Sequence, residues 1–288
     1  MPPTLDVSAY QNLLQSFLRE DLGSGDITTE TTVSPAQRAR GEVIAKAPLV
    51  LAGIELFAEV FRILDPATTV EIIFRDAEEL IPGQIPARVN STARALLSGE
   101  RVALNLLQRL SGVATLTRQF VRAVAGTGAE ILDTRKTTPG LRALEKYAVR
   151  VGGGRNHRKD LGEAVLIKEN HIRLAGGVDA ALLAAQAAQG RASWIEIEVT
   201  NLDELRAALA HGPDIILLDN MSPALVRQAV EQVRAHNSPR KIRTEASGGI
   251  TIANVREFAE AGVDWISVGA LTHSAPAVDL SFEIEPCS

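Results

Sequence analysis

The second half of the chain alternates six short apolar segments with stretches of helical periodicity. The apolar segments are centred near residues 132, 167, 197, 217, 245 and 267. Such alternation predicts parallel strands covered by helices. An open doubly wound sheet fits the same alternation, but nearly every predicted strand carries charged or small residues at its C-terminal end, where (β/α) barrels build their active sites. We therefore expect an α/β fold that contains a (β/α) barrel of about six parallel strands.

The first half of the chain predicts a separate domain of mixed helices and strands. Helical spacing in residues 6–23 stops at Gly23, and a second helical stretch covers residues 56–64. Residues 41–53, 68–74 and 86–96 have the amino-acid composition of β-strands and are predicted to form them.

A long helical pattern covers residues 98–126 and separates the two halves. We place a domain boundary within it. The expected organisation is an N-terminal α+β sandwich domain in residues 1–112, the barrel with the active site in residues 113–272, and a C-terminal segment in residues 273–288 that returns to the N-terminal domain.

Positive charge is concentrated in one segment of a chain that is acidic overall. Between Arg135 and Arg173 there are ten Lys and Arg residues and four Asp and Glu residues, a balance of +6 in a protein of net charge −5. Because the rest of the molecule is strongly negative and only 4% of residues are aromatic, a nucleic-acid surface is not expected. A focused pocket for a small anion is the better interpretation.

The sequence also indicates the cellular compartment of the protein. Cys287 is the single cysteine, which excludes an internal disulfide framework and a cysteine-rich zinc site and is typical of a reducing cytoplasm. The longest uncharged run, Trp265 to Val278, is too short and too polar to span a bilayer, so no membrane partner is expected. We predict a cytoplasmic protein.

Polar residues cluster after the predicted barrel strands. Lys168 and Glu198 each lie within or at the end of an apolar run, so each needs a partner if it is buried. For Glu169, Glu196 and Glu245 a solvated loop position is an equally good interpretation. The full set of strand-end residues is Asp133, Arg135, Lys136, Lys168, Glu169, Asn170, Glu196, Glu198, Asp219, Asn220, Glu245, Ser247 and Gly269.

The last two strands have the features of a phosphate site. Ser247, Gly248 and Gly249 in "EASGGIT" and Gly269 in "SVGALT" offer bare backbone N–H groups where barrels commonly bind phosphate. A pair of tight turns would give the same residues.

Carboxylates and cations at neighbouring strand ends indicate two further ligands. Glu198 and Asp219 suit Mg²⁺, which is typically held by one or two carboxylates together with substrate phosphates. A second anion is then expected at the basic group, because Arg side chains match carboxylates. This group consists of Arg135, His157, Arg158 and Lys168.

Several motifs in order resemble the quinolinate phosphoribosyltransferase family over almost the whole chain. They are "EDLGSGDITTE", "SGERVALNLLQRLSGVATLT", "DTRKTTPGLRALEKYAVRVGGGRNHR", "LIKENH", "IEIEV", "LLDNMSP", "EASGGI" and "VGALTHSAP". The resemblance implies an N-terminal α/β sandwich followed by an unusual barrel of six strands. It also implies a homodimer or larger homo-oligomer, in which the N-terminal region of one subunit helps to close the barrel of the other.

The resemblance further implies a reaction and a role for each site residue. The reaction is the Mg²⁺-dependent transfer of a phosphoribosyl group from phosphoribosyl pyrophosphate to quinolinate with decarboxylation, which gives nicotinate mononucleotide in NAD synthesis. Lys136, Glu198 and Asp219 would surround the ribose, pyrophosphate and Mg²⁺, and Ser247, Gly248, Gly249 and Gly269 would bind the 5-phosphate. The implied quinolinate residues are Arg135, His157, Arg158 and Lys168, with Arg101 from the partner subunit, and Thr137 is implied to bind substrate.

Three alternatives stay open on the sequence. A Schiff-base aldolase or decarboxylase would use Lys168 or Lys136 as its nucleophile. A paralogue with this fold could act on another acid, and a ligand-binding regulatory protein would hold the same groups without turnover.

Overall fold

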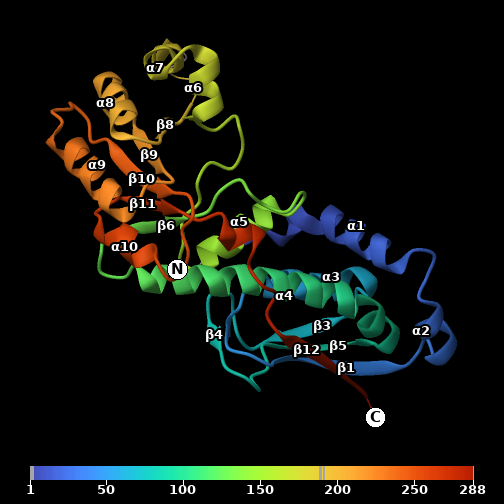
Figure 1. Ribbon diagram of the computed structural model, residues 1–288. Coiled ribbons are helices and arrows are strands. Elements are labelled where there is room, and N and C mark those ends of the chain that lie inside the picture. Colours follow the sequence, from blue (N-terminus) through green and yellow to red (C-terminus); the bar gives the residue numbers. More distant parts are fainter. Residues whose placement is uncertain (1–2, 188–189, 191, 288) are drawn as a thin grey trace. The chain divides into compact units, whose positions relative to one another are not determined.

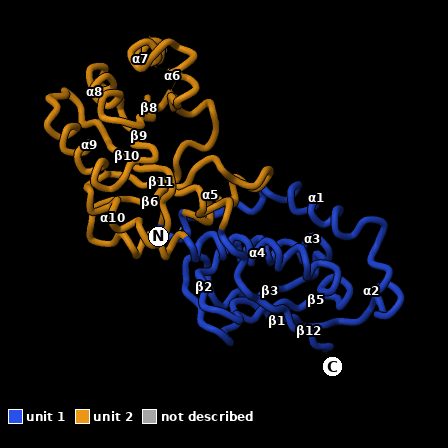
Figure 2. Tube along the Cα trace, viewed as in Figure 1, with its two compact units in different colours: residues 1–116, 150–153, 275–288 blue, residues 117–149, 154–274 orange. Residues whose placement is uncertain are grey.

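The computed structural model describes residues 3–187, 190 and 192–287, and the chain divides into two compact units. Unit 1 contains residues 1–116, 150–153 and 275–288, and unit 2 contains residues 117–149 and 154–274 (Figure 2). Helix α4, Ala93–Ala123, runs from the first unit into the second. No helix among the described residues is both long enough and apolar enough to cross a membrane.

Unit 1 is built on a four-stranded antiparallel sheet with the order β12-β1-β5-β3. Along β1 the buried and more exposed side chains alternate, as expected for a sheet with one face in a core. The core under α3 contains Phe57, Phe61 and Phe282, whose ring centroids lie 5.1–5.7 Å apart. The strands are β1 Arg38–Ala45, β3 Thr69–Ile72, β5 Ala87–Thr92 and β12 Leu280–Pro286, with a separate pair β2 Leu49–Val50 and β4 Glu79–Leu80.

The helices of unit 1 begin and end with recognisable caps. Asp26 caps α2 by accepting a hydrogen bond from the Thr29 N–H at 2.9 Å. The helices before α4 are η1 Val7–Tyr10, α1 Gln11–Leu22, α2 Ile27–Thr32 and α3 Ile54–Leu64. Of the predicted strands, residues 41–53 contain two separate strands, and residues 86–96 turn into helix at Ala93. The helix expected from residue 98 therefore begins five residues earlier, at Ala93. Ala93 to Leu97 are good helix formers, but they directly follow a strand and were predicted as part of it.

Unit 2 contains the predicted six-stranded parallel sheet, in the order β6-β11-β10-β9-β8-β7. The barrel-like α/β fold expected from the alternation is confirmed (Figure 1). β6 and β7 are the two end strands of the ladder. The strands are β6 Glu130–Leu132, β7 Val165–Ile167, β8 Ile195–Val199, β9 Ile215–Asp219, β10 Arg243–Ser247 and β11 Trp265–Ser267.

Helices of unit 2 follow the strands and cover the sheet. All five residues of β8 are buried, as are the first four of β9, which is typical of parallel strands covered by helices. The C-terminal ends of all six strands are at one edge, so their last residues and the loops after them meet there. The helices are α5 Arg142–Val151, α6 Glu169–Ala175, α7 Val178–Ala187, α8 Leu202–His211, α9 Pro223–Ala235, α10 Val255–Glu260 and α11 Ala270–His273.

Candidate active site

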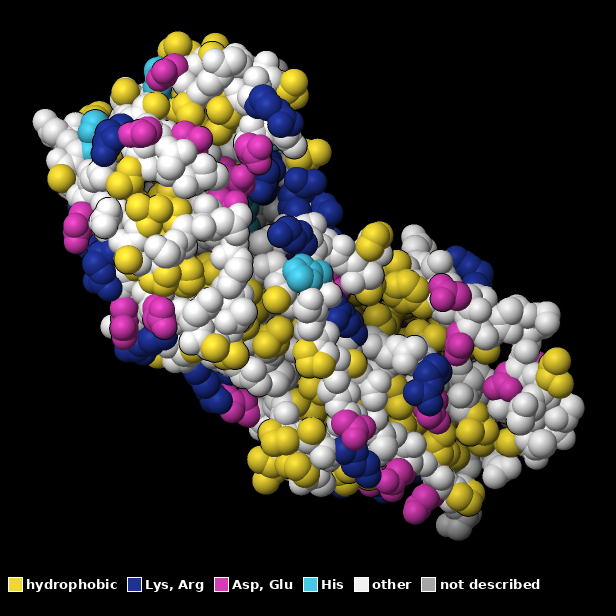
Figure 3. Space-filling view, in the orientation of Figure 1, with side chains coloured by type: hydrophobic (Ala, Val, Ile, Leu, Met, Phe, Trp, Pro, Cys, Tyr) yellow, Lys and Arg dark blue, Asp and Glu magenta, His cyan; other side chains and the backbone are white. Residues whose placement is uncertain are grey.

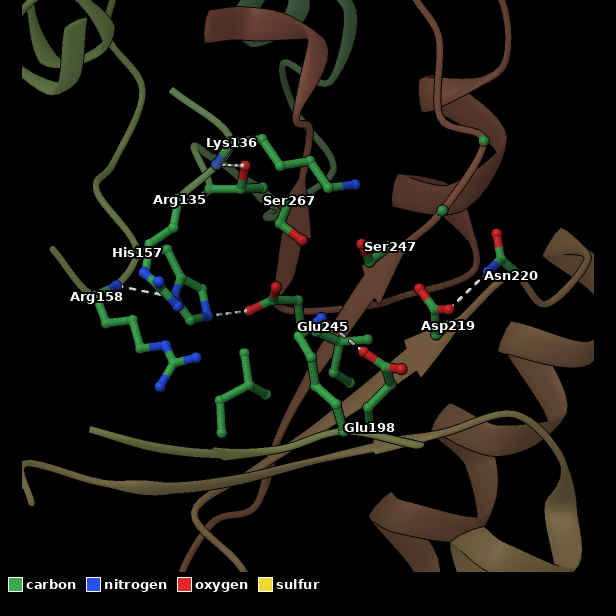
Figure 4. A pocket seen from close by; sticks show the side chains of 16 residues that line it. Arg135, Lys136, His157, Arg158, Glu198, Asp219, Asn220, Glu245, Ser247 and Ser267 are labelled. Atoms are coloured by element: carbon green, nitrogen blue, oxygen red, sulfur yellow. Dashed lines mark hydrogen bonds and ion pairs between the residues drawn. The ribbon is translucent and has the colours of Figure 1, made fainter. Parts of the chain in front are cut away.

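A cavity of about 560 Å³ lies at the C-terminal ends of the barrel strands, entirely within unit 2. Most of the predicted site residues line it, and Figure 4 shows their side chains converging from β8, β9, β10, β11 and the loops between them. In Figure 3, Lys and Arg side chains gather along one side of this unit with carboxylates beside them. The predicted residues that line the cavity are Arg135, Lys136, His157, Arg158, Lys168, Glu198, Asp219, Ser247, Gly248 and Gly249.

Two arginines form the most basic part of the cavity wall. The Arg158 side chain is buried, and its Nη1 donates to the Ala164 carbonyl oxygen at 2.9 Å. Burial lowers the pKa of the Arg158 guanidinium, and the positive charge of Arg135 lowers it further. The buried Nε of Arg135 has no hydrogen-bond partner among the described residues. Two like charges beside an unused buried donor make a site that an anion would complete.

A buried network fixes the loop that carries His157 and Arg158. Asp133, at the end of β6, accepts hydrogen bonds from the His157 N–H at 2.9 Å and from the Lys146 ammonium. Lys146 also donates to the His157 carbonyl oxygen at 2.9 Å. Burial raises the pKa of the Asp133 carboxyl, and the ammonium of Lys146 opposes that shift. The sequence analysis did not single out Lys146, whose position in α5 is an ordinary one for a helical lysine.

His157 lines the cavity with its ring while both of its nitrogens bond to the protein. Nδ1 accepts the Arg158 N–H at 2.8 Å, which assigns the ring hydrogen to Nε2. Nε2 lies 3.0 Å from Glu196 Oε2, and the Trp194 indole N–H donates to the same oxygen at 3.2 Å. The histidine predicted as a ligand is therefore held in one tautomer by its protein neighbours.

Glu196 and Glu245, for which a solvated position was an equally good interpretation, are both fully buried. Glu169 is exposed on the first turn of α6. The two buried carboxyl groups flank His157, with Glu245 Oε2 at 3.6 Å from the imidazole Nε2. Glu245 also lines the cavity. Apart from the apolar neighbours of Glu196, Ile195 and Ile197, no local sequence pattern indicates this buried pair.

Carboxylates and a lysine meet on the next two strands. Lys168 Nζ, at the end of β7, forms an ion pair with Glu198 Oε2 of β8 at 2.9 Å. A partner was expected for each of these two residues, and each is the partner of the other. Burial raises the pKa of the Asp219 carboxyl at the end of β9, and the charge of Glu198 raises it further. Two neighbouring carboxylates of this kind are suited to a bound cation.

A glycine turn follows β10 and faces the cavity. Gly248 and Gly249 have φ of +91° and +63°, values that side chains other than glycine adopt poorly. A side chain at Gly248 would collide with Asn220, which also lines the cavity and has φ of +53°. The backbone therefore approaches the cavity here more closely than any other residue would allow.

Three predicted site residues lie outside the cavity lining. Thr137 accepts a hydrogen bond from Arg142 Nε at 3.0 Å, and a Cβ at Gly269 would lie 3.1 Å from Lys136 Cδ. Arg101 belongs to unit 1, where its half-exposed side chain lies 3.4 Å from Glu100. Its predicted entry into a partner's site stays a prediction. The cavity-lining residues that the sequence analysis did not select are Thr134, Leu166, Leu217 and Ser267.

Comparison with known proteins identifies the family. The model of the quinolinate phosphoribosyl transferase N-terminal domain matches residues 26–111, and that of the C-terminal domain matches residues 113–283. The probable carboxylating nicotinate-nucleotide pyrophosphorylase of Bacillus subtilis is 43% identical over 95% of this chain and 93% of its own length. The carboxylating nicotinate-nucleotide pyrophosphorylase of Mycobacterium leprae is 42% identical, with 97% and 98% covered.

The solved structures agree with the sequence relatives. The crystal structure of NadC from Streptococcus pyogenes has a TM-score of 0.93 and 38% identity, and the match covers 99% of this chain and 100% of that one. The resemblance carried by the sequence motifs is thereby confirmed: the chain belongs to the quinolinate phosphoribosyltransferase family and is a phosphoribosyltransferase.

Proposed function

We propose that the protein transfers a phosphoribosyl group from phosphoribosyl pyrophosphate to quinolinate, with Mg²⁺, and that decarboxylation gives nicotinate mononucleotide, pyrophosphate and CO₂. The relatives named as carboxylating nicotinate-nucleotide pyrophosphorylases support this activity. The observation that carries the proposal is a single cavity with Arg135 and the buried Arg158 on one wall and the carboxylates of Glu198 and Asp219 on another.

Arg135 and Arg158 suit the two carboxylates of quinolinate. Their guanidinium groups can each form a fork with a carboxylate, and the unpartnered Arg135 Nε offers a further donor. Lys168, which shares the cavity, adds a charge that Glu198 balances while no substrate is bound. A monocarboxylate would leave part of this positive charge without a counterion, so we expect the dicarboxylate to be preferred.

Glu198 and Asp219 fit a Mg²⁺ ion that phosphoribosyl pyrophosphate would bring with it. Their carboxylates are the oxygen ligands that Mg²⁺ prefers, and the pKa of Asp219 is raised first by burial and then by the negative charge of Glu198. When bound, Mg²⁺ would neutralise negative charge on the pyrophosphate. We assign the 5-phosphate to the turn at Ser247, Gly248 and Gly249, where exposed backbone N–H groups can approach an anion closely.

The residues of the chain act mainly by orientation and charge. Lys136, whose side chain lies against Gly269, is placed to stabilise the departing pyrophosphate. The arginines hold the pyridine nitrogen toward the ribose carbon that pyrophosphate leaves, and this nitrogen needs no general base because it has a free lone pair. Once alkylated, the ring is a pyridinium that accepts the electron pair released as the adjacent carboxylate departs as CO₂.

Imine formation at Lys168 would require a free amine, whereas the Lys168 ammonium is paired with Glu198 at 2.9 Å. A regulatory protein would hold the same groups, so turnover is the property that separates it from the enzyme. The homo-oligomer with Arg101 in the partner's site, and the cytoplasmic location, stay predictions.

A steady-state assay tests the proposal. The protein is incubated with phosphoribosyl pyrophosphate, Mg²⁺ and either quinolinate or nicotinic acid, and nicotinate mononucleotide is followed. We expect turnover with quinolinate and none with nicotinic acid. No turnover with either acid, in protein that is folded and oligomeric, would refute the proposed reaction and favour the paralogue.

A further inference from the structure

Decarboxylation of the substrate requires a proton donor in the cavity. If the proposed function holds, the ring carbon that loses CO₂ keeps the electron pair of the broken C–C bond and must receive a proton to give the product. A carbanion that finds no donor can recapture CO₂ before it escapes. A group that carries a proton at neutral pH should therefore face the substrate.

Glu245 is in the right place for this task. Its side chain projects from β10 and lines the cavity, and Figure 4 shows its carboxyl group between His157, Ser247 and Ser267. The residue is fully buried, and neither carboxyl oxygen has a hydrogen-bond partner among the described residues. A buried polar group with no protein partner is costly unless a ligand or its own protonation relieves it.

The surroundings of Glu245 keep it neutral. Burial and then the charge of Glu196 raise the pKa of Glu245 to about 8, against opposing contributions from His157, the Ser267 hydroxyl group and Lys168. Glu196 accepts hydrogen bonds from both His157 and Trp194, so it is the better placed of the two to hold the negative charge. Glu245 then retains the proton.

The other proton-bearing groups beside this part of the cavity are engaged. The Nε2–H of His157 faces Glu196 at 3.0 Å, and Lys168 is paired with Glu198 at 2.9 Å. Lys136 lies against Gly269, on the side assigned to the phosphates. Among these groups, only Glu245 lines the cavity and also carries a proton that is not engaged with another protein group.

We propose that Glu245 is the general acid that protonates the ring carbon from which CO₂ departs. The bond between that carbon and the carboxylate breaks, and its electron pair remains on the carbon. A new C–H bond forms with the carboxyl hydrogen of Glu245, and the electrons of the O–H bond stay on the glutamate oxygen. The carboxylate formed lies 3.6 Å from His157 Nε2, and it regains a proton from water after the product leaves.

Glu245→Gln tests the assignment because glutamine keeps the shape of the side chain and removes the acid. In a single turnover of the full-length protein with quinolinate, phosphoribosyl pyrophosphate and Mg²⁺, pyrophosphate and CO₂ are quantified separately. We expect pyrophosphate release to stay close to the wild-type rate and CO₂ release to slow by roughly 100-fold, the usual contribution of a general acid. The N-ribosylated dicarboxylate should accumulate.

Glu231→Gln on the exposed face of α9 is the control, since it makes the same change away from the cavity and leaves the charged groups that face Glu245 in place. In this variant the two releases should remain coupled, even if both are slower. Coupled releases in Glu245→Gln, or loss of both in the folded variant, would overturn the proposal. Failure of the wild-type protein to form nicotinate mononucleotide would instead refute the proposed function.

A wild-type measurement keeps the proposal testable if Glu245→Gln does not fold. The charged groups that face Glu245 are Glu196 of β8, His157 of the loop before β7 and Lys168 at the end of β7. CO₂ release in a single turnover should fall about tenfold for each pH unit above the pKa of about 8, while pyrophosphate release should not. A CO₂ rate that is unchanged up to pH 9.5 would overturn the proposal.

Discussion

The buried carboxyl group of Glu245 predicts how stability depends on pH. Its pKa is raised from 4.5 to about 8, so the folded protein holds a proton that the unfolded chain releases. The contribution of Glu245 to the free energy of unfolding is therefore greatest below pH 4.5 and falls as pH rises toward about 8. At 1.36 kcal/mol per pH unit, this contribution is smaller by about 1 kcal/mol at pH 5 and by about 3 kcal/mol at pH 7.

Glu245→Gln removes this titration and should remove the loss. We expect the variant to gain stability relative to wild type as pH rises from 5 to 8. Urea unfolding followed by tryptophan fluorescence measures it, because the two tryptophans of the chain, Trp194 and Trp265, both belong to unit 2. The control is Glu231→Gln on the exposed face of α9, whose difference from wild type should not change with pH.

The refuting result is also clear. If the difference between Glu245→Gln and wild type is the same at pH 5 and pH 8, Glu245 holds no extra proton in the folded state. The stability measurements would then refute the proposal that Glu245 is a neutral acid in the cavity, whatever the kinetics show.

Three further substitutions test the other parts of the site. Arg158→Lys keeps the charge but loses the planar fork, so the KM for quinolinate should rise by about tenfold or more while the KM for phosphoribosyl pyrophosphate stays unchanged; equal shifts in both would contradict the assignment. Gly248→Ala places a methyl group against Asn220 at a positive φ, so the KM for phosphoribosyl pyrophosphate should rise by about tenfold or more and the midpoint of thermal unfolding should fall. Normal kinetics in this variant would contradict the assignment of the 5-phosphate to this turn. Asp219→Asn removes one proposed Mg²⁺ ligand, so half-maximal activity should need about tenfold more Mg²⁺; an unchanged Mg²⁺ titration would place the ion elsewhere.

Much of the fold could be predicted because local pattern and global topology agree. The apolar runs of β8 and of the first four residues of β9 are fully buried, and parallel strands must bring their C-terminal ends together. Asp219, Glu198 and Ser247 could thus be grouped without knowledge of a single distance. Where two local signals competed, as at Ala93, the sequence misplaced the start of the helix.

The electrostatic state of the site could not be predicted in the same way. The sequence left Glu196 and Glu245 undecided between solvent and core, and the structure buries both beside one histidine. Whether a carboxyl group is charged depends on its burial and on neighbours from other strands, and neither is a property of the local sequence.

By itself, then, the sequence determined the strands, the edge at which the polar side chains meet, and the family motifs. Tertiary structure alone decided that Lys168 pairs with Glu198, that Lys146 and Asp133 hold the His157 loop, and that Glu196 and Glu245 are buried beside His157. The physical reason is distance along the chain. Strand and helix periodicity arises between residues close in the chain. The ion pairs of the site instead join residues that lie from 13 positions apart, for Asp133 and Lys146, to 88 positions apart, for His157 and Glu245, and they exist only once the barrel has formed.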